Sequence, residues 1–205
     1  MKIVSLKDRR KSLTAVTLED GRELLLDSET VVINNLAPGV RLDDPDALIY
    51  ESDLKRAKSR ALWYLSRSDL SEKKLKEKLK QGGFKPKACE AAVLRMKELG
   101  LINDERLAER LYEYLSSTGA SKREIIYKLQ NKGIPYETVK NLAEEDCSDE
   151  SEKIKNLIET KYASKLNDED GAKKVFAALL RKGYSYSDVR SALNAYLDEQ
   201  IEEEF

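Results

Sequence analysis

The sequence contains no histidine, and this absence removes a large part of ordinary enzyme chemistry. Imidazole is the commonest general base near neutral pH and the commonest metal ligand, so histidine triads and histidine metal sites are excluded. Cys89 and Cys147 are the two thiols, too few for a structural zinc site of the usual kind. No glycine-rich phosphate-binding phrase is present either. We therefore expect a protein that is not an enzyme and binds no cofactor.

Long apolar runs are also lacking. No stretch approaches the roughly eighteen apolar residues that a membrane span needs, and the start of the chain lacks the apolar core of a signal peptide. We expect a cytoplasmic protein with no membrane contact, in which the two thiols do not form a disulfide. The charged fraction is 37% and the net charge is −1, so the overall charge does not indicate a nucleic-acid partner.

The N-terminal part of the chain has the features of a small β-structure followed by helices. Two short runs, 12–18 and 22–26, flank an Asp-Gly dipeptide, which is a strong signal for a β-hairpin. Residues 28–35 fit either a strand or a short capped helix, and we favour the helix. Asp44 and Pro45 resemble an N-cap and a first-turn proline, so they predict the start of a long helix.

The rest of the chain repeats itself with a period of fifty residues. Each copy begins with a serine or glycine, continues with two apolar residues four apart, and ends with a glycine followed by another apolar residue. The three copies are Ser71, Leu75, Leu79, Gly83 and Phe84; Ser121, Ile125, Leu129, Gly133 and Ile134; and Gly171, Val175, Leu179, Gly183 and Tyr184. Such a repeat indicates stacked supersecondary units. It predicts three tandem three-helix units whose middle helices lie near 71–81, 121–131 and 171–181.

Local signals within each unit support this interpretation. Ser121 with Glu124 and Ser185 with Asp188 fit capping boxes, and each middle helix is followed by a glycine suited to a left-handed C-terminal residue. Cys89 is in register with a valine in the other two units, so we interpret it as a small core residue. The predicted fold is mainly α, with three tandem three-helix repeats preceded by a small N-terminal β-hairpin segment.

The predicted segments follow from this register. They are an N-terminal hairpin and short helix at 1–53, a basic first repeat at 54–102, a second repeat at 103–150, and a third repeat at 151–205 that ends in an acidic tail from residue 198. Cys147 lies in an acidic connector and is expected to be exposed.

Aromatic residues allow two interpretations. They can stack on nucleic-acid bases, as in proteins that bind single strands, or they can pack in the core. Their helical spacing beside leucines favours core packing for Trp63 and Tyr64, and a similar division, with some rings at unit junctions, is expected for Tyr112, Tyr114, Tyr127 and Tyr136.

The three-unit pattern resembles the RecX family. The most specific stretch is Leu-Ile-Asn-Asp-Glu-Arg-Leu-Ala at 101–108, which is similar to the family's Tyr-Leu-Asp-Asp-x-x-Phe-Ala. Asn103 stands where the family usually has aspartate, and Leu107 where it has phenylalanine. The resemblance implies a regulator of homologous recombination, DNA repair and the SOS response. Such a regulator is expected to bind the RecA recombinase filament on single-stranded DNA and to modulate its ATPase and strand exchange, and we favour inhibition over activation.

The distribution of charge suggests which surface meets a partner. Residues 56–105 hold thirteen Lys and Arg against seven Asp and Glu. Within this segment the lysines surround two inward-facing leucines and are free to meet phosphates or an acidic protein face, although a merely solvated surface remains an open alternative. The candidate partner-binding residues are Lys73, Lys74, Lys76, Lys78, Lys80, Lys122, Arg123 and Lys132.

Two other classes of function stay open. Three short helices with a glycine turn also resemble helix-turn-helix modules, which would make the chain a direct binder of single- or double-stranded DNA. The third helices, however, share no base-reading pattern at their starts. A general helical-repeat scaffold is the other alternative. We expect a monomer in each case.

Overall fold

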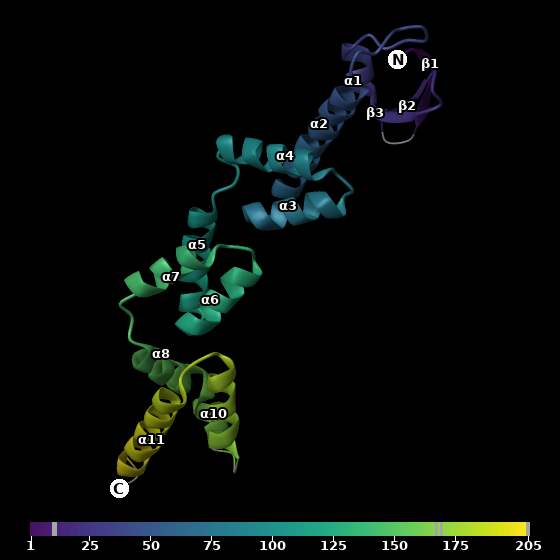
Figure 1. Ribbon diagram of the computed structural model, residues 1–205. Coiled ribbons are helices and arrows are strands. Elements are labelled where there is room, and N and C mark those ends of the chain that lie inside the picture. Colours follow the sequence, from purple (N-terminus) through teal and green to yellow (C-terminus); the bar gives the residue numbers. More distant parts are fainter. Residues whose placement is uncertain (10–11, 167, 169, 204–205) are drawn as a thin grey trace. The chain divides into compact units, whose positions relative to one another are not determined.

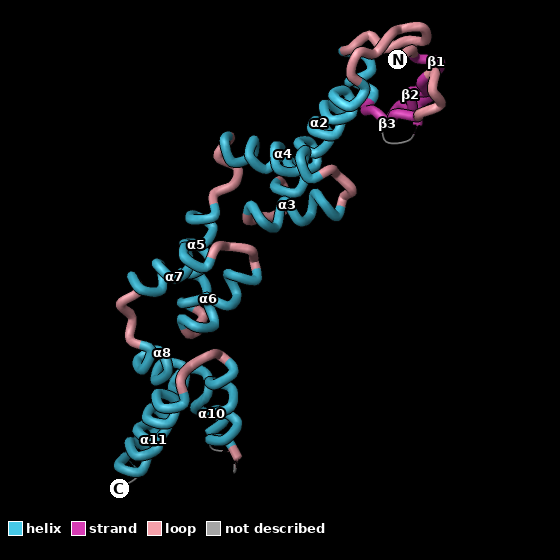
Figure 2. The backbone as a smooth tube through the Cα atoms, viewed as in Figure 1, coloured by secondary structure: helices cyan, strands magenta, loops and turns pink. Residues whose placement is uncertain are grey.

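The structure is a computed structural model that describes residues 1–9, 12–166, 168 and 170–203, with side chains up to Asp198. Helices predominate, and one small antiparallel sheet lies near the N-terminus (Figures 1 and 2). The chain divides into two compact units, Met1–Asn103 and Asp104–Phe205. The predicted fold class, mainly α with three-helix repeats after a small β-segment, is confirmed. The finer division into four segments stays a prediction.

The sheet has the order β1-β2-β3, with β1 (Ile3–Arg9), β2 (Leu13–Leu18) and β3 (Glu23–Asp27) all antiparallel. The predicted hairpin is therefore confirmed as β2 and β3. Strand β1 was not predicted, because in its sequence only Ile3 is fully buried and no alternation of apolar and polar residues marks a strand. Main-chain pairing with β2 places it in the sheet.

Two helices follow the sheet. The ambiguous segment forms a helix, α1 (Ser28–Ile33). Its N-cap is Asp27, since the Asp27 carboxylate accepts hydrogen bonds from the backbone N–H groups of Glu29 and Thr30. The long helix α2 (Pro45–Leu65) begins where predicted, with Asp44 as its N-cap. It packs on the sheet core near its start and on a separate helical core near its end.

Three groups of helices correspond to the predicted repeats. The first combines the end of α2 with α3 (Glu72–Gln81) and α4 (Pro86–Glu98); the second is α5 (Asp104–Ser117), α6 (Lys122–Asn131) and α7 (Tyr136–Glu145); the third is α8 (Glu150–Leu157), the π-helical turn η1 (Ile158–Tyr162), α9 (Ala163–Leu166), α10 (Gly171–Arg181) and α11 (Tyr186–Glu203). Each group surrounds its own cluster of buried apolar side chains.

The fifty-residue register is confirmed in the middle helices. Their six predicted core residues are all buried: Leu75, Leu79, Ile125, Leu129, Val175 and Leu179. In the third helices, Cys89 and its valine counterparts are buried as well. The glycines after the middle helices have φ values of 84°, 85° and 87°, as a left-handed C-terminal residue requires. The two predicted caps are present, with N–O distances of 3.1 Å in each case.

The first helices of the units depart from this register. In the third unit the buried positions are Ile154, Ile158 and Tyr162, whereas Lys161 and Lys165 are exposed. The π-helical turn Ile158–Tyr162 lies at this point, and a π-helical turn holds one more residue than an α-helical turn. Alignment by a constant offset therefore fails here.

Several predictions about aromatic and terminal residues are corrected. The four tyrosines were expected to divide mainly in favour of the core, but only Tyr112 is buried, and Tyr114, Tyr127 and Tyr136 are exposed. Cys147 is exposed, as predicted. The acidic tail after Asp198 lies outside the residues whose side chains are described.

Candidate partner-binding surfaces

Helix α3 carries the five lysines predicted to meet a partner. Ser71 caps the helix by accepting a hydrogen bond from the backbone N–H of Lys74, and the two buried leucines turn the lysines away from the core. Three of the five have partners within the protein. Lys74 pairs with Glu77 at 2.9 Å, Lys76 pairs with Glu90 at 2.8 Å, and the Lys78 ammonium lies 5.3 Å from the centroid of the Tyr64 ring.

These pairings change the electrostatics of the α3 surface. The hydrogen bond from Lys74 lowers the pKa of Glu77, and the hydrogen bond from Lys76 lowers the pKa of Glu90. Both carboxylates are therefore held in the charged form and offset part of the positive charge. Lys73 and Lys80 are exposed and form no ion pair with another described residue, so they are the lysines best placed to meet an external anion.

The second predicted basic group does not form one surface. Lys122 is engaged in hydrogen bonds within the protein: its backbone N–H donates to Glu150 at 2.7 Å, and its ammonium donates to the carbonyl of Asp146. Arg123 is exposed beside it at the N-terminal end of α6, but Lys132 is the C-cap of the same helix. A helix of ten residues is about 15 Å long, so the structure does not bring Lys132 to the other two.

The start of α6 is instead a junction between the second and third helical groups. The Ser121 hydroxyl donates to the carbonyl of Lys182 at 2.6 Å while it also caps α6. The Lys182 ammonium and the Tyr184 hydroxyl both donate to the carbonyl of Gly119, at 3.1 and 3.2 Å. Burial raises the pKa of Tyr184 to about 12, so this phenol remains a donor at neutral pH. These groups stabilise the junction.

A partly buried polar network lies nearby and was not anticipated. Asp146 accepts hydrogen bonds from the backbone N–H of Ser148 at 2.9 Å, the hydroxyl of Tyr112 at 3.0 Å and the ammonium of Lys153 at 3.4 Å. Burial acts to raise the pKa of Asp146, but these bonds outweigh it and hold the pKa well below its ordinary value. Tyr112 lies 34 residues from Asp146 in the sequence, so no local motif could have identified their contact.

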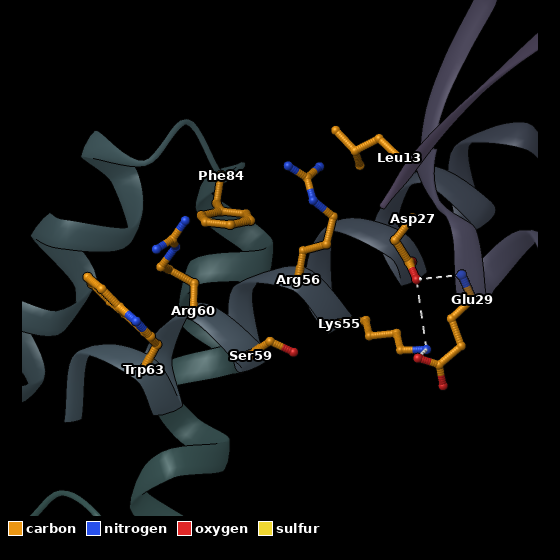
Figure 3. Close-up of a pocket in the computed structure, with 9 residues that line it drawn as sticks. All are labelled: Leu13, Asp27, Glu29, Lys55, Arg56, Ser59, Arg60, Trp63 and Phe84. Carbon is orange, nitrogen blue, oxygen red and sulfur yellow. Dashed lines mark hydrogen bonds and ion pairs between the residues drawn. The ribbon is translucent and has the colours of Figure 1, made fainter. Parts of the chain in front are cut away.

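A groove in the first compact unit is a further candidate surface. It has a volume of about 400 Å³ and lies between the sheet, α2 and the loop before α4 (Figure 3). Its lining residues are Leu13, Asp27, Glu29, Lys55, Arg56, Ser59, Arg60, Trp63 and Phe84. The expectation that Trp63 packs in the core is wrong, because this side chain is 43% exposed. Ala57 and Ala61 take the buried face of α2, and a residue two positions after Ala61 points about 200° away from it.

The two ends of the groove differ in charge. At one end the Lys55 ammonium lies 2.6 Å from Glu29 and 3.8 Å from Asp27, so this cation is balanced by two carboxylates. At the other end, the guanidinium carbons of Arg60 and Arg67 lie 5.0 and 4.2 Å from the centroid of the Trp63 ring. Figure 3 shows Arg60 and Trp63 projecting from α2 on the same side as the Phe84 ring. The sequence had marked neither arginine.

The described residues include no group of three or more Cys, Asp or Glu side chains placed to hold a metal ion. Among the same residues, no helix is both long and apolar enough to cross a bilayer. The features that the structure does present are basic and aromatic surfaces on stacked helices.

The fold and these surfaces define a helical-repeat protein with exposed basic and aromatic faces. The family model of the RecX first three-helix domain matches residues 57–96, and that of the RecX third three-helix domain matches residues 148–193. The chain is therefore similar to RecX proteins in its first and third helical groups.

Curated relatives and solved structures agree with this similarity. A protein of Streptococcus pneumoniae named "Regulatory protein RecX" is 29% identical over the whole of this chain and 80% of its own length. The protein of that name from Caldanaerobacter subterraneus is 29% identical over 95% of this chain and 99% of its own. A crystal structure of regulatory protein RecX has a TM-score of 0.62 at 22% identity and covers 94% of this chain and 98% of its own. The crystal structure of RecX from Lactobacillus salivarius has a TM-score of 0.59 at 24% identity, and the match covers 70% of this chain and 96% of that protein. These two structures support the fold.

Proposed function

We propose that this protein regulates homologous recombination and DNA repair, within the SOS response, by binding the RecA filament on single-stranded DNA. Binding lowers the ATPase and strand-exchange activities of the recombinase, and the regulator itself catalyses nothing. The observation that carries the proposal is the similarity to regulatory RecX proteins along the whole chain. The protein acts in the cytoplasm as a monomer.

The mechanism needs only a difference in affinity. A filament whose subunits exchange between arrangements shifts toward the arrangement that a ligand binds better, by no more than the difference in binding free energy. Three linked helical units make separate contacts possible, and each further contact within one chain forms at a high effective concentration. Modest contacts by single units therefore give strong binding by the intact chain.

The basic helix α3 is the proposed electrostatic contact. Lys73 and Lys80 are exposed, and their charges are available to phosphates of the bound strand or to carboxylates of the recombinase. Arg123 supplies a further exposed cation in the second helical group. We keep Lys74, Lys76, Lys78, Lys122 and Lys132 as candidate contacts whose roles depend on whether they exchange their internal partners for external ones.

The test is an assay of the cognate recombinase with and without the full-length protein. DNA-dependent ATP hydrolysis and strand exchange should both fall as the regulator is added, and filaments viewed by electron microscopy should shorten or lose continuity. Inhibition at far less than one regulator per recombinase would indicate action at filament ends, whereas inhibition near equal amounts would indicate coating of the filament.

Bovine serum albumin at the same concentration serves as the control for non-specific protein effects. The proposal fails if the folded regulator, at micromolar excess, leaves the ATPase rate, strand exchange and filament length unchanged.

A further inference from the structure

The groove beside Trp63 is lined by arginines and aromatic rings that have no part in the proposed regulation. We propose that this groove binds a short segment of single-stranded nucleic acid, with the guanidinium groups of Arg60 and Arg67 on phosphates and a base against the Trp63 ring. The ligand is the naked strand, so this proposal stands independently of any effect on a recombinase.

The exposure of Trp63 is the first observation. It is the only tryptophan in the chain, and a large aromatic side chain left in water forgoes the favourable burial that it usually obtains. The ring is held in place by an edge contact with Tyr64, at 5.2 Å between centroids, and by the Arg60 and Arg67 guanidinium groups that lie over it. It is thus both exposed and preorganised, as a stacking platform must be.

The arginines are the second observation. Among the described residues, no carboxylate forms an ion pair with Arg60 or Arg67, whereas Arg56 shares its charge with Asp53 at 3.6 Å. Guanidinium is a planar donor whose paired N–H groups match phosphate oxygens, and it stacks on aromatic rings at the same time. Both guanidinium groups lie over the Trp63 ring, so they must turn toward phosphates for a base to take their place on the ring.

The walls of the groove favour a single strand over other anions. The rings of Trp63 and Phe84 and the side chain of Leu13 supply flat and apolar surface, which an unpaired base can contact on its face. A duplex keeps these faces stacked inside, and an acidic peptide offers carboxylates without a matching flat ring. At the opposite end, Asp27 and Glu29 would repel phosphates, which places the strand at the Trp63 end.

The groove also connects with the basic surface of α3. The Tyr64 ring is approached by the Arg60 guanidinium at 5.9 Å and by the Lys78 ammonium at 5.3 Å. A strand seated beside Trp63 can therefore continue along a line of cations toward α3. This continuity adds phosphate contacts that act at longer range and strengthen with decreasing salt.

Because Trp63 is the sole tryptophan, its fluorescence reports directly on the groove of the full-length protein. A short oligothymidylate is titrated at several salt concentrations, beside an abasic strand of equal length, a duplex and polyglutamate. The expected result is quenching and saturable binding with the oligothymidylate, weaker binding without quenching for the abasic strand, and little response to the others. Two phosphate contacts in the groove contribute about −1.4 to the slope of log K against log salt.

Variants assign the binding to named side chains, with affinity measured by anisotropy of a labelled oligothymidylate. Trp63→Ala should weaken binding by about 5- to 100-fold, and Trp63→Phe should retain most of it. Arg60→Gln and Arg67→Gln should each weaken binding and reduce the magnitude of the salt slope by about 0.7. Arg181→Gln and Tyr127→Ala, which change exposed residues of the other compact unit, are the matched controls, and circular dichroism verifies folding.

Unchanged affinity in folded Trp63→Ala, equal binding of the abasic strand, or preference for polyglutamate or duplex would overturn the proposal. The recombinase assay distinguishes this inference from the proposed function. Binding of naked strand without any effect on the recombinase supports the groove and contradicts the regulation, and the reverse outcome contradicts the groove alone.

Discussion

At the scale of single residues, Asp146 shows how a surface connector acquires a structural role. It lies in the acidic segment between α7 and α8, yet it joins Tyr112 of α5 to Lys153 of α8 through its carboxylate. Because all three donors favour the charged form, its pKa is lower in the folded than in the unfolded protein. A depressed carboxyl pKa contributes stability at pH values above the unfolded pKa, and that stability is lost as the pH falls.

Asp146→Asn should lower the free energy of unfolding at pH 7 by about 1.5–3 kcal/mol, since hydrogen bonds to a charged group are lost or weakened. The difference from the wild type should narrow as the pH falls below 3.8, the ordinary pKa of the carboxyl group. Urea unfolding followed by circular dichroism at pH 7, 5 and 3 measures it. Glu109→Gln, an exposed change on α5, is the control, and a gap that does not depend on pH would contradict the assignment.

At the scale of elements, the glycines after the middle helices separate local from tertiary requirements. Gly83 and Gly183 have nearly the same φ, 84° and 87°. A Cβ atom on Gly83 would meet nothing within 4 Å, whereas one on Gly183 would lie 2.6 Å from the Ser121 hydroxyl oxygen. That hydroxyl is fixed by its bonds to α6 and to the Lys182 carbonyl, so it cannot move without breaking one.

Gly83→Ala should therefore cost about 1 kcal/mol of stability from backbone strain alone. Gly183→Ala should cost at least about 1 kcal/mol more, because the added methyl group overpacks the junction. Chemical denaturation of both variants and the wild type compares the two costs directly. Equal costs would mean that the Ser121 junction adapts freely.

The elements also show what local sequence can predict. The middle helices were predictable because their caps, apolar spacing and terminal glycines lie within one short stretch. Strand β1 and the π-helical turn Ile158–Tyr162 were not, since pairing with β2 and packing of Ile158 and Tyr162 in the third core produce them. Neither leaves a periodic pattern in the sequence.

At the scale of the whole molecule, the attraction of a surface for anions depends more on its cations without an internal ion pair than on its total number of cations. The α3 surface contains five lysines, but ion pairs with Glu77 and Glu90 occupy two of them. If free cations govern association with an anionic filament, removing unpaired charges should matter more than removing the same number of paired ones.

Lys73→Gln with Lys80→Gln should weaken binding to the nucleoprotein filament and reduce its salt dependence. Lys74→Gln with Lys76→Gln removes the same net charge from the same helix and should have the smaller effect. Anisotropy titrations with labelled filaments at several salt concentrations compare the two double variants, after circular dichroism has shown that both fold. Equal effects would indicate that only the overall charge matters, and no effect would indicate a merely solvated surface.

Sequence alone determined the repeat, the six core positions of the middle helices and the RecX resemblance, because each rests on residues close together in the chain or on a constant offset. Only the tertiary structure decided which charged and aromatic side chains are available to a partner. Exposure depends on what packs from distant elements: Trp63 faces outward because Ala57 and Ala61 fill the core side of α2, and Lys122 is occupied because Glu150 and Asp146 reach it from another segment.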